Sequence, residues 1–311
     1  MAFDSNGLMN RGFAVQGNRI YVVGRDAGSS TASVYIDHYS TDTGERIKRV
    51  AVDDAVKGLY YPGNDIFQDA AGNLCVSNLV LDVKSYAVNV HQVDPETGVA
   101  TLRASVMTSL PATKRIDHCN VYGDVSSSQF YVFAVMSSGT QVVRWTITDG
   151  NVSATDMMTA KGYSPSGASS FGIAPRVFPV SPTQVYVNGA NTYVTLYNFS
   201  TGSILDSMDG NPAIKPANTG SNGFAMFDMG GKAYMLYPYG DHLADDGYRF
   251  MLVQSNGAST SFKDFGHMWT FPTRGLGGIN SSTWDAPCCV TDGAKSTEKR
   301  IYIYVPGNGL A

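Results

Sequence analysis

Short apolar runs, most of them centred on a tyrosine and separated by polar turns, recur along this chain at a near-constant interval. Each run centres on an apolar or aromatic triplet, and successive centres lie 48 to 68 residues apart. Short apolar runs bounded by turn residues are typical of β-strands, and strands repeated with a period of about 40–50 residues or slightly more indicate a radial β-architecture. The triplets are Ile20-Tyr21-Val22, Leu74-Cys75-Val76, Phe130-Tyr131-Val132, Val185-Tyr186-Val187, Ala233-Tyr234-Met235 and Ile301-Tyr302-Ile303.

Other columns repeat in step with these triplets. A large apolar residue precedes the central position by eight residues at Phe13, Phe67, Phe178 and Met226. In the first, second and fifth units a polar turn that contains Gly or Asn separates the two positions. A third strand follows, and a second turn leads into a fourth strand. Four antiparallel strands joined by such hairpins make one blade of a propeller. The second turns are Asp42-Thr43-Gly44, Glu96-Thr97-Gly98, Thr148-Asp149-Gly150, Ser200-Thr201-Gly202 and Ser255-Asn256-Gly257.

The pattern therefore predicts an all-β chain folded as one β-propeller over residues 1–311. We expect six blades of four antiparallel strands, and the last blade has too little sequence for all of its strands. Either the N-terminal segment Met1 to Leu8 completes that blade or the chain is truncated, because an open ring leaves unpaired strand edges. The alternative of seven blades requires a repeat that the sequence does not supply. The expected blades span residues 10–58, 62–112, 117–170, 174–216, 222–272, and 284–311 together with 1–9.

Composition and charge narrow the function classes. The chain has 33 Gly, 18 Tyr and 14 Phe in 311 residues, only 15% of residues are charged, and no convincing amphipathic helical stretch occurs. A net charge of −4 without any run of Lys or Arg argues against a nucleic-acid partner. The sequence contains no stretch of about 18 apolar residues, so its pattern predicts no transmembrane segment. The first residues lack the basic start and apolar core of a signal peptide.

The predicted fold places a candidate binding site at one mouth of the central channel. The innermost strand of each blade lines that channel, and the residues just before these strands surround its mouth. Arginine forks and carboxylates recognise polar ligands, and an aromatic face beside them suits a sugar ring. We therefore expect a non-catalytic site for a polar small molecule, a glycan or a peptide. Its candidate residues are Arg11, Asn64, Asp65, His118, Arg176, Asn222, Trp284 and Asp285.

Two alternative functions are compatible with the same predicted fold. In the first, a divalent cation at the channel mouth assists a hydrolase or lactonase; Asn64 and Asp285 are the candidate ligands, and calcium is the cation that such oxygen atoms take. In the second, the ring is a scaffold that binds a protein partner on one face. No GxSxG, HExxH or Walker-type motif occurs in the sequence. The pattern therefore assigns no catalytic residue.

A family resemblance adds to this interpretation. The run from Gly63 to Leu79 resembles the D-x-x-G-N-L-x-V-x-N signature of NHL-type and gluconolactonase-like propellers. With its closing segment from Tyr302 to Gly309, the chain more closely resembles the uncharacterised secreted propeller domains of gut Bacteroidetes, the DUF4623-like group. That resemblance implies an exported, periplasmic or cell-surface protein that handles glycans, and it brings no established catalytic residues. Gluconolactonase-like propellers hold a divalent cation with acidic and amide side chains. Asn64 and Asp285 match that set, whereas the expected Glu is missing, which counts against lactonase activity.

Overall fold

The computed structural model describes residues 10–57, 59–108, 115–161, 170–190, 192–215, 223–239, 249–272, 288–293, 295, 297–305 and 309–310. Almost all of the regular structure in this part is β. Three short 3₁₀ turns occur at Asp54–Val56, Met208–Gly210 and Phe262–Asp264. Within the described residues, no helix has the length and apolar character needed to cross a membrane.

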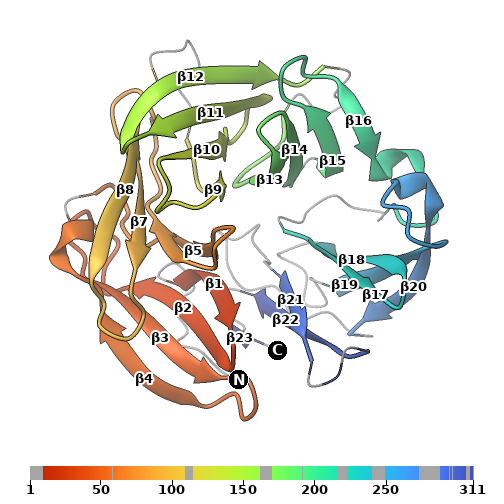
Figure 1. The fold of residues 1–311 in the computed structure, drawn as a ribbon, viewed down its shortest axis with the longest axis horizontal. Helices are drawn as coiled ribbons and strands as arrows, with labels where there is room; N and C mark the ends of the chain where they lie inside the picture. The colour runs from red at the N-terminus through yellow and green to blue at the C-terminus, as the bar shows by residue number, and fades with distance from the viewer. Residues whose placement is uncertain are drawn as a thin grey trace.

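The strands form antiparallel sheets arranged around a common centre (Figure 1). In each of five sheets, four consecutive strands lie in simple up-and-down order, and every strand pairs with its neighbour in sequence. The strands are β1 Asn10–Gln16, β2 Arg19–Arg25, β3 Val34–Ser40 and β4 Arg46–Ala51; β5 Asp65–Gln68, β6 Leu74–Ser77, β7 Val88–Val93 and β8 Ala100–Val106; β9 Cys119–Tyr122, β10 Gln129–Val135, β11 Gln141–Thr148 and β12 Asn151–Thr159; β13 Arg176–Ser181, β14 Gln184–Gly189, β15 Thr192–Asn198 and β16 Ile204–Ser207; β17 Ala225–Met229, β18 Lys232–Tyr239, β19 Arg249–Ser255 and β20 Phe265–Phe271; β21 Cys288–Asp292, β22 Lys299–Val305 and β23 Gly309–Leu310.

The predicted propeller of four-stranded antiparallel blades is confirmed, whereas the predicted number of such blades is wrong. The structure has five four-stranded blades, and the last sheet, β21-β22-β23, has three strands among the described residues. Only six residues of this sequence follow β22, and they provide one short strand, in which Gly309 and Leu310 pair with Val305 and Tyr304. No seventh sheet occurs in the described part of the chain. The segment Met1 to Leu8, which we expected to complete the last blade, lies outside the described residues.

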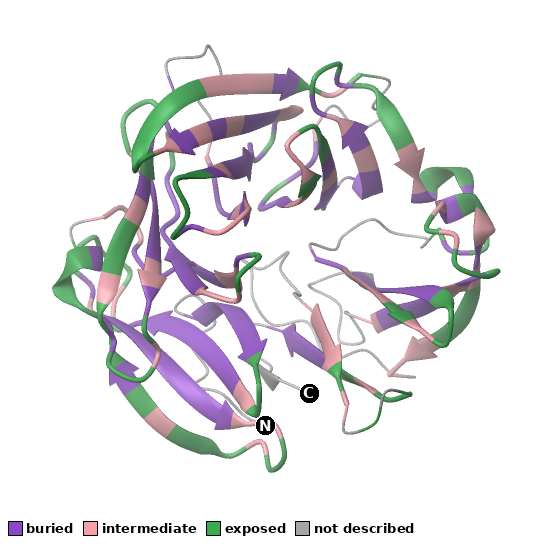
Figure 2. Cartoon of the chain, in the orientation of Figure 1, coloured by how far each residue is buried: buried purple, intermediate pink, exposed green. Residues whose placement is uncertain are grey.

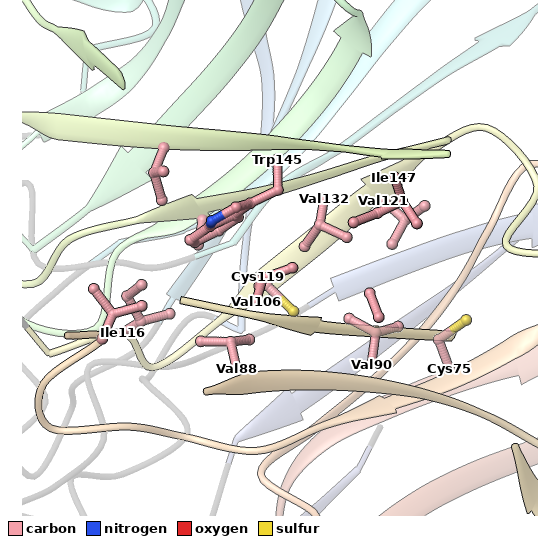
Figure 3. Packing of buried hydrophobic residues seen from close by; sticks show 14 of the residues in the cluster. Cys75, Val88, Val90, Val106, Ile116, Cys119, Val121, Val132, Trp145 and Ile147 are labelled. Atoms are coloured by element: carbon pink, nitrogen blue, oxygen red, sulfur yellow. The ribbon is translucent and has the colours of Figure 1, made fainter. Parts of the chain in front are cut away.

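Hydrophobic clusters between neighbouring sheets hold the blades together. The second and third strands of the four-stranded blades are mostly buried, and the outermost strands β4, β8, β12, β16 and β20 carry most of the exposed residues of these sheets (Figure 2). Between the second and third blades, Trp145 is fully buried among Val88, Val106 and Ile116 (Figure 3), and its indole N–H donates to the Met107 carbonyl at 2.7 Å. Apolar strand residues of neighbouring sheets thus pack into buried clusters between the blades.

The last sheet packs against the first blade. Tyr302 and Tyr304 of β22 share a buried cluster with Phe13, Ile20 and Tyr39 of the first blade. The Tyr304 hydroxyl donates to the Asn10 carbonyl at 2.7 Å, and the Arg300 guanidinium lies 3.0 Å from the Asp42 carboxylate. The ring therefore closes through side-chain packing between β22 and the first blade.

The predicted second turns do more than reverse the chain. In the second and fourth blades, Asp94 and Asn198 side-chain oxygens each accept two backbone N–H groups of the turn. The carbonyls of Gly98 and Gly202 then accept N–H groups from the preceding blades, at 2.8 Å from Asp53 and 2.7 Å from Lys161. These two turns therefore connect successive blades at the outer rim.

Two buried histidines are expected to make the stability of this fold depend on pH. Burial lowers the pKa of His91 from 6.5 to about 4, and burial, with Lys48 as a second cause, also lowers the pKa of His38. Because the unfolded chain binds more protons in this range, the free energy of unfolding should fall as the pH drops from about 6.5 towards 4, by roughly 3 kcal/mol through His91 alone. Urea unfolding at several pH values between about 4.5 and 7.5 measures this slope.

Replacing His91 isolates its contribution. His91→Gln removes the titrating group, so the variant should lose less stability than the parent protein on acidification, whatever its stability at neutral pH. An equally steep acid loss in His91→Gln and in the parent protein would show that this interpretation is wrong.

Candidate functional site

The sheets converge on a group of buried polar residues at the start of their innermost strands. Asn64 precedes β5 and Asp65 begins it; Asp117 and His118 precede β9; Arg176 begins β13. Each of these residues is at most 9% exposed. Consecutive residues of extended backbone point to opposite sides, so Asn64 and Asp117 join one cluster, and Asp65 and His118 join another.

The first cluster, which we call the clamp, consists of Arg11, Asn64, Asp117, Arg115 and Ser137. The Asn64 amide donates to the Asp117 carbonyl at 2.7 Å and accepts from Arg11 Nη1 at 3.4 Å, and Arg11 lies 3.7 Å from the Asp117 carboxylate. Arg115 Nε and the Ser137 hydroxyl donate to the same carboxylate at 2.9 and 2.6 Å. These contacts hold the first three blades in fixed register, so the clamp has a structural role.

The second cluster, the Asp65 cluster, consists of Asp65, His118 and Arg176. Asp65 Oδ2 lies 2.8 Å from His118 Nδ1 and accepts from Arg176 Nη1 at 3.0 Å. Asp65 Oδ1 accepts the Ile66 backbone N–H at 3.0 Å. One buried carboxylate therefore orients an imidazole from the third blade and a guanidinium from the fourth blade.

Glycine at position 12 makes room for the Asp65 cluster. A Cβ atom added to Gly12 would lie 2.2 Å from Asp65 Oδ1 and 2.7 Å from the Ile66 nitrogen. Real Cβ atoms do not approach other atoms so closely, and the neighbouring atoms belong to a buried side chain and to backbone. The first blade therefore approaches Asp65 only because residue 12 has no side chain.

A cavity of about 160 Å³ lies at the centre of the ring, next to the Asp65 cluster. Five of the innermost strands and the segment that leads into β17 contribute to its wall. Apart from the Asp65 cluster, the polar side chains on the wall are Gln68 and Asn120, and much of the remainder is aromatic or aliphatic. The lining residues are Phe13, Ala14, Val15, Asp65, Ile66, Phe67, Gln68, His118, Cys119, Asn120, Arg176, Val177, Phe178, Gly223, Phe224, Cys288 and Cys289.

Three cysteines on the cavity wall are protonated at neutral pH. Burial raises the pKa of Cys119 to about 12 and that of Cys289 to about 11, and burial also raises the pKa of Cys288. All three are free thiols. Because the thiolate is the nucleophilic form, these residues act as small apolar groups in the wall.

The structure brings together the five predicted site residues that it describes. Asp65, His118 and Arg176 line the cavity, whereas Arg11 and Asn64 belong to the clamp and do not line it. The other three predicted residues, Asn222, Trp284 and Asp285, lie outside the described residues. Asn64 is a poor candidate for a metal ligand because its amide oxygen accepts from a guanidinium. The described residues contain no group of three or more His, Cys, Asp or Glu side chains arranged to hold a metal ion.

Sequence reasoning missed the aromatic wall of the cavity, although the sequence contains its signal. The apolar column eight residues before each strand centre includes Phe13, Phe67 and Phe178, and all three line the cavity. Cys289, which holds the corresponding place in the last sheet, lines it as well. This column was interpreted only as a feature of the repeat, and the innermost strands to which it belongs place it on the channel.

Comparison with known proteins supports the fold. No protein-family model and no curated protein matches the chain. The structure is similar to that of a DUF4623 family protein from Bacteroides eggerthii, with a TM-score of 0.69 and 14% sequence identity over 97% of this chain and 69% of that protein. A calcium-binding protein, regucalcin from Agrobacterium tumefaciens, also matches, with a TM-score of 0.46 and 10% identity over 92% of this chain and 80% of the other. The likeness to the DUF4623 protein shows a shared propeller fold.

Proposed function

We propose that this chain is a recognition domain that binds a small polar molecule in the central cavity. One observation carries the proposal: the cavity at the channel axis has the Asp65 cluster on its wall together with four phenylalanines. Binding sites commonly combine an apolar wall with a few fixed polar groups that orient the ligand. The Asp65 cluster supplies such groups, because His118 and Arg176 are held by the same carboxylate.

The size of the cavity favours a small ligand over a glycan chain or a peptide. Sites for drug-sized ligands occupy roughly 300–1,000 Å³, and this cavity measures about 160 Å³. A molecule the size of one sugar ring or one amino acid suits that volume. A longer glycan or a peptide would extend beyond the space that the described residues enclose.

The hydrogen bonds and the protonation of the polar groups on the cavity wall favour recognition over catalysis. The Asp65 carboxylate already accepts from a backbone N–H, and it contacts both His118 and Arg176. The three thiols have raised pKa values. The alternative of a metal-dependent hydrolase requires several ligands that converge on one cation, and Asp285, one of its two candidate ligands, lies outside the described residues.

The surface gives less support to a protein-interaction scaffold. Large exposed apolar side chains occur on the outermost strand of every four-stranded blade: Ile47, Leu102, Val152, Leu205 and Trp269. Apolar residues scattered in this way are normal on a protein surface.

The resemblance to secreted Bacteroidetes propellers further supports an extracytoplasmic location, which forms part of the proposal.

Thermal-shift screening tests the proposed site. The screen contains neutral monosaccharides, amino acids, small carboxylates and small phosphate esters. At least one compound is expected to raise the melting temperature by a few degrees when its concentration is about a hundred times its dissociation constant. Arg176→Met and His118→Gln should each reduce the affinity for that ligand by about tenfold or more, because hydrogen bonds to charged groups contribute roughly 1.5–3 kcal/mol.

The control is Arg300→Met, which removes an exposed guanidinium at the rim of the ring. It should leave the ligand-induced shift unchanged. Circular dichroism of each variant without ligand establishes that the sheets are retained. If the same ligand stabilises the parent protein, Arg176→Met and His118→Gln equally, the binding site lies elsewhere.

A further inference from the structure

Carboxamide side chains bond to the backbone of the next blade at three successive steps around the axis. In two of these contacts the amide donates to a backbone carbonyl, and in the third its oxygen accepts a backbone N–H. The pairs, side chain first, are Asn64 with Asp117 at 2.7 Å, Asn120 with Val177 at 3.4 Å, and Asn188 with Gly223. Uncharged amide groups are therefore the partners that this fold itself provides for backbone near the axis.

The innermost strands have an edge that suits such contacts. Among the described strands, β1, β5, β9 and β13 each lie at one end of a sheet and pair with one strand only. The unpaired edge of a strand carries both N–H donors and C=O acceptors. An amide group also carries both a donor and an acceptor, so a ligand amide can bond to this backbone in either of the two ways that the asparagines show.

Gln68 adds a carboxamide to the cavity wall. It ends β5 and lines the cavity, and its side-chain amide makes no hydrogen bond in the part of the chain that the structure describes. A glutamine amide has two donors and one acceptor, and it can form paired hydrogen bonds with a flat partner that presents a donor beside an acceptor. A carboxamide or a cyclic amide is such a partner.

The Gln68 contact is separate from the Asp65 cluster. Asp65 begins β5 and Gln68 ends it, so with a rise of about 3.3 Å per residue their backbones lie about 10 Å apart. The members of the Asp65 cluster are engaged with protein partners. Recognition of an amide through Gln68 therefore requires no change in the contacts of that cluster.

The aromatic part of the wall favours a flat ligand. Phe13, Phe67, Phe178 and Phe224 line the cavity, and the rings of Phe178 and Phe224 meet edge to face with their centroids 4.4 Å apart. Aromatic rings pack well against the face or the edge of another planar ring. The thiols on the wall add no charge, since burial raises their pKa values.

We propose that the ligand of the central cavity is a flat, uncharged molecule that carries a carboxamide or a cyclic amide. Its amide bonds to Gln68 and to backbone of the innermost strands, and its ring packs against the phenylalanines. The cavity of about 160 Å³ suits one ring with its amide group. This inference rests on the proposed function and adds the chemical class of the ligand to it.

Isothermal titration calorimetry with matched probes tests the inference. Benzamide and 2-pyridone carry the two kinds of amide, and acetophenone and 2-methoxypyridine are counterparts of similar shape that lack the amide N–H. At least one amide should bind about three- to tenfold more tightly than its counterpart, because the counterpart loses a hydrogen bond. Benzoate and glucose, which differ from the proposed class in charge and in shape, should bind more weakly than that amide.

Variants place the amide in the cavity. Gln68→Met keeps the length of the side chain and removes its hydrogen bonds, so it should reduce the affinity for the preferred amide by about threefold or more and affect the counterpart less. The control is Gln129→Met, which changes an exposed glutamine at the start of β10 that does not line the cavity. It should leave both affinities unchanged. Circular dichroism establishes that each variant retains its sheets.

The possible results separate the two proposals. If each counterpart binds as tightly as its amide, or if Gln68→Met binds the amide as well as the parent protein does, the inference is wrong. If neither amide binds but a compound of the thermal-shift screen does, the inference is wrong and the proposed function stands. If no amide and no compound of the screen binds, both proposals fail.

Discussion

Replacing Gly98 by alanine is expected to lower the free energy of unfolding by about 2–5 kcal/mol. Gly98 has a φ of +78°, where side chains are unfavourable, and an added Cβ would lie 1.9 Å from the Ala51 carbonyl oxygen of the preceding blade. The second effect is the larger one, because the atom in the way belongs to backbone that ends the outermost strand of the first blade. Chemical denaturation measures the loss.

Gly150 provides the matched control for this experiment. It lies in the corresponding turn of the third blade with a φ of +77°, and no atom would lie within 4 Å of its added Cβ. Gly150→Ala should therefore lose only the conformational contribution of about 1–2 kcal/mol. Gly202→Ala should behave like Gly98→Ala, because its Cβ would lie 2.1 Å from the Thr159 carbonyl oxygen. Equal losses at Gly98 and Gly150 would refute the proposed contact between blades.

Replacing Asp117 by asparagine is expected to reduce the free energy of unfolding by about 3–5 kcal/mol. Asp117 is fully buried and accepts from Arg115 and Ser137, and Arg11 lies 3.7 Å away. An amide in its place leaves the buried guanidinium of Arg11 and the partly exposed guanidinium of Arg115 without the carboxylate that compensates their charge. The cost arises from the uncompensated charge, since the shape of the side chain is conserved. Denaturant unfolding of the variant gives the magnitude.

The comparison for Asp117→Asn is Asp42→Asn. Asp42 pairs with Arg300 at 3.0 Å, and its side chain is 62% exposed. A solvent-exposed ion pair of this kind contributes about 0–1 kcal/mol, so the two variants should differ clearly in stability. A loss of less than about 1 kcal/mol for Asp117→Asn would mean that the clamp does not stabilise the ring.

The fold could be predicted because every blade repeats the same local physics. The apolar run Ile20-Tyr21-Val22 and its counterparts identify strands, and turns such as Glu96-Thr97-Gly98 mark where the chain reverses. The number of four-stranded blades was not predictable in the same way, because strand periodicity needs about four residues or more to be recognised. The strand β23 consists of Gly309 and Leu310 alone, which pair with Val305 and Tyr304 of β22, so no periodic pattern marks it in the sequence.

The candidate site was predictable in composition and less so in orientation. Arg11, Asn64, Asp65, His118 and Arg176 were expected together at one mouth of the channel; the structure shows them buried and in contact with one another within two clusters, and their role in ligand binding stays a prediction. Which of them line the cavity depends on the phase of each inner strand, since a shift of one residue exchanges the two sides. For this reason the sequence could not separate Asn64, a clamp residue, from Asp65, a cavity residue. The roles of Asn222, Trp284 and Asp285 stay predictions.

The sharing of one carboxylate by three blades has a consequence for how this sequence can diverge. Because Asp65 contacts both His118 and Arg176 and sits against Gly12, a change at any of these positions alters the surroundings of all the others. Substitutions near the axis are therefore expected to occur together or not at all. Residues of the outermost strands are expected to change independently of one another. Homologues would keep similar residues around Asp65, whereas the sequences of their outermost strands would differ.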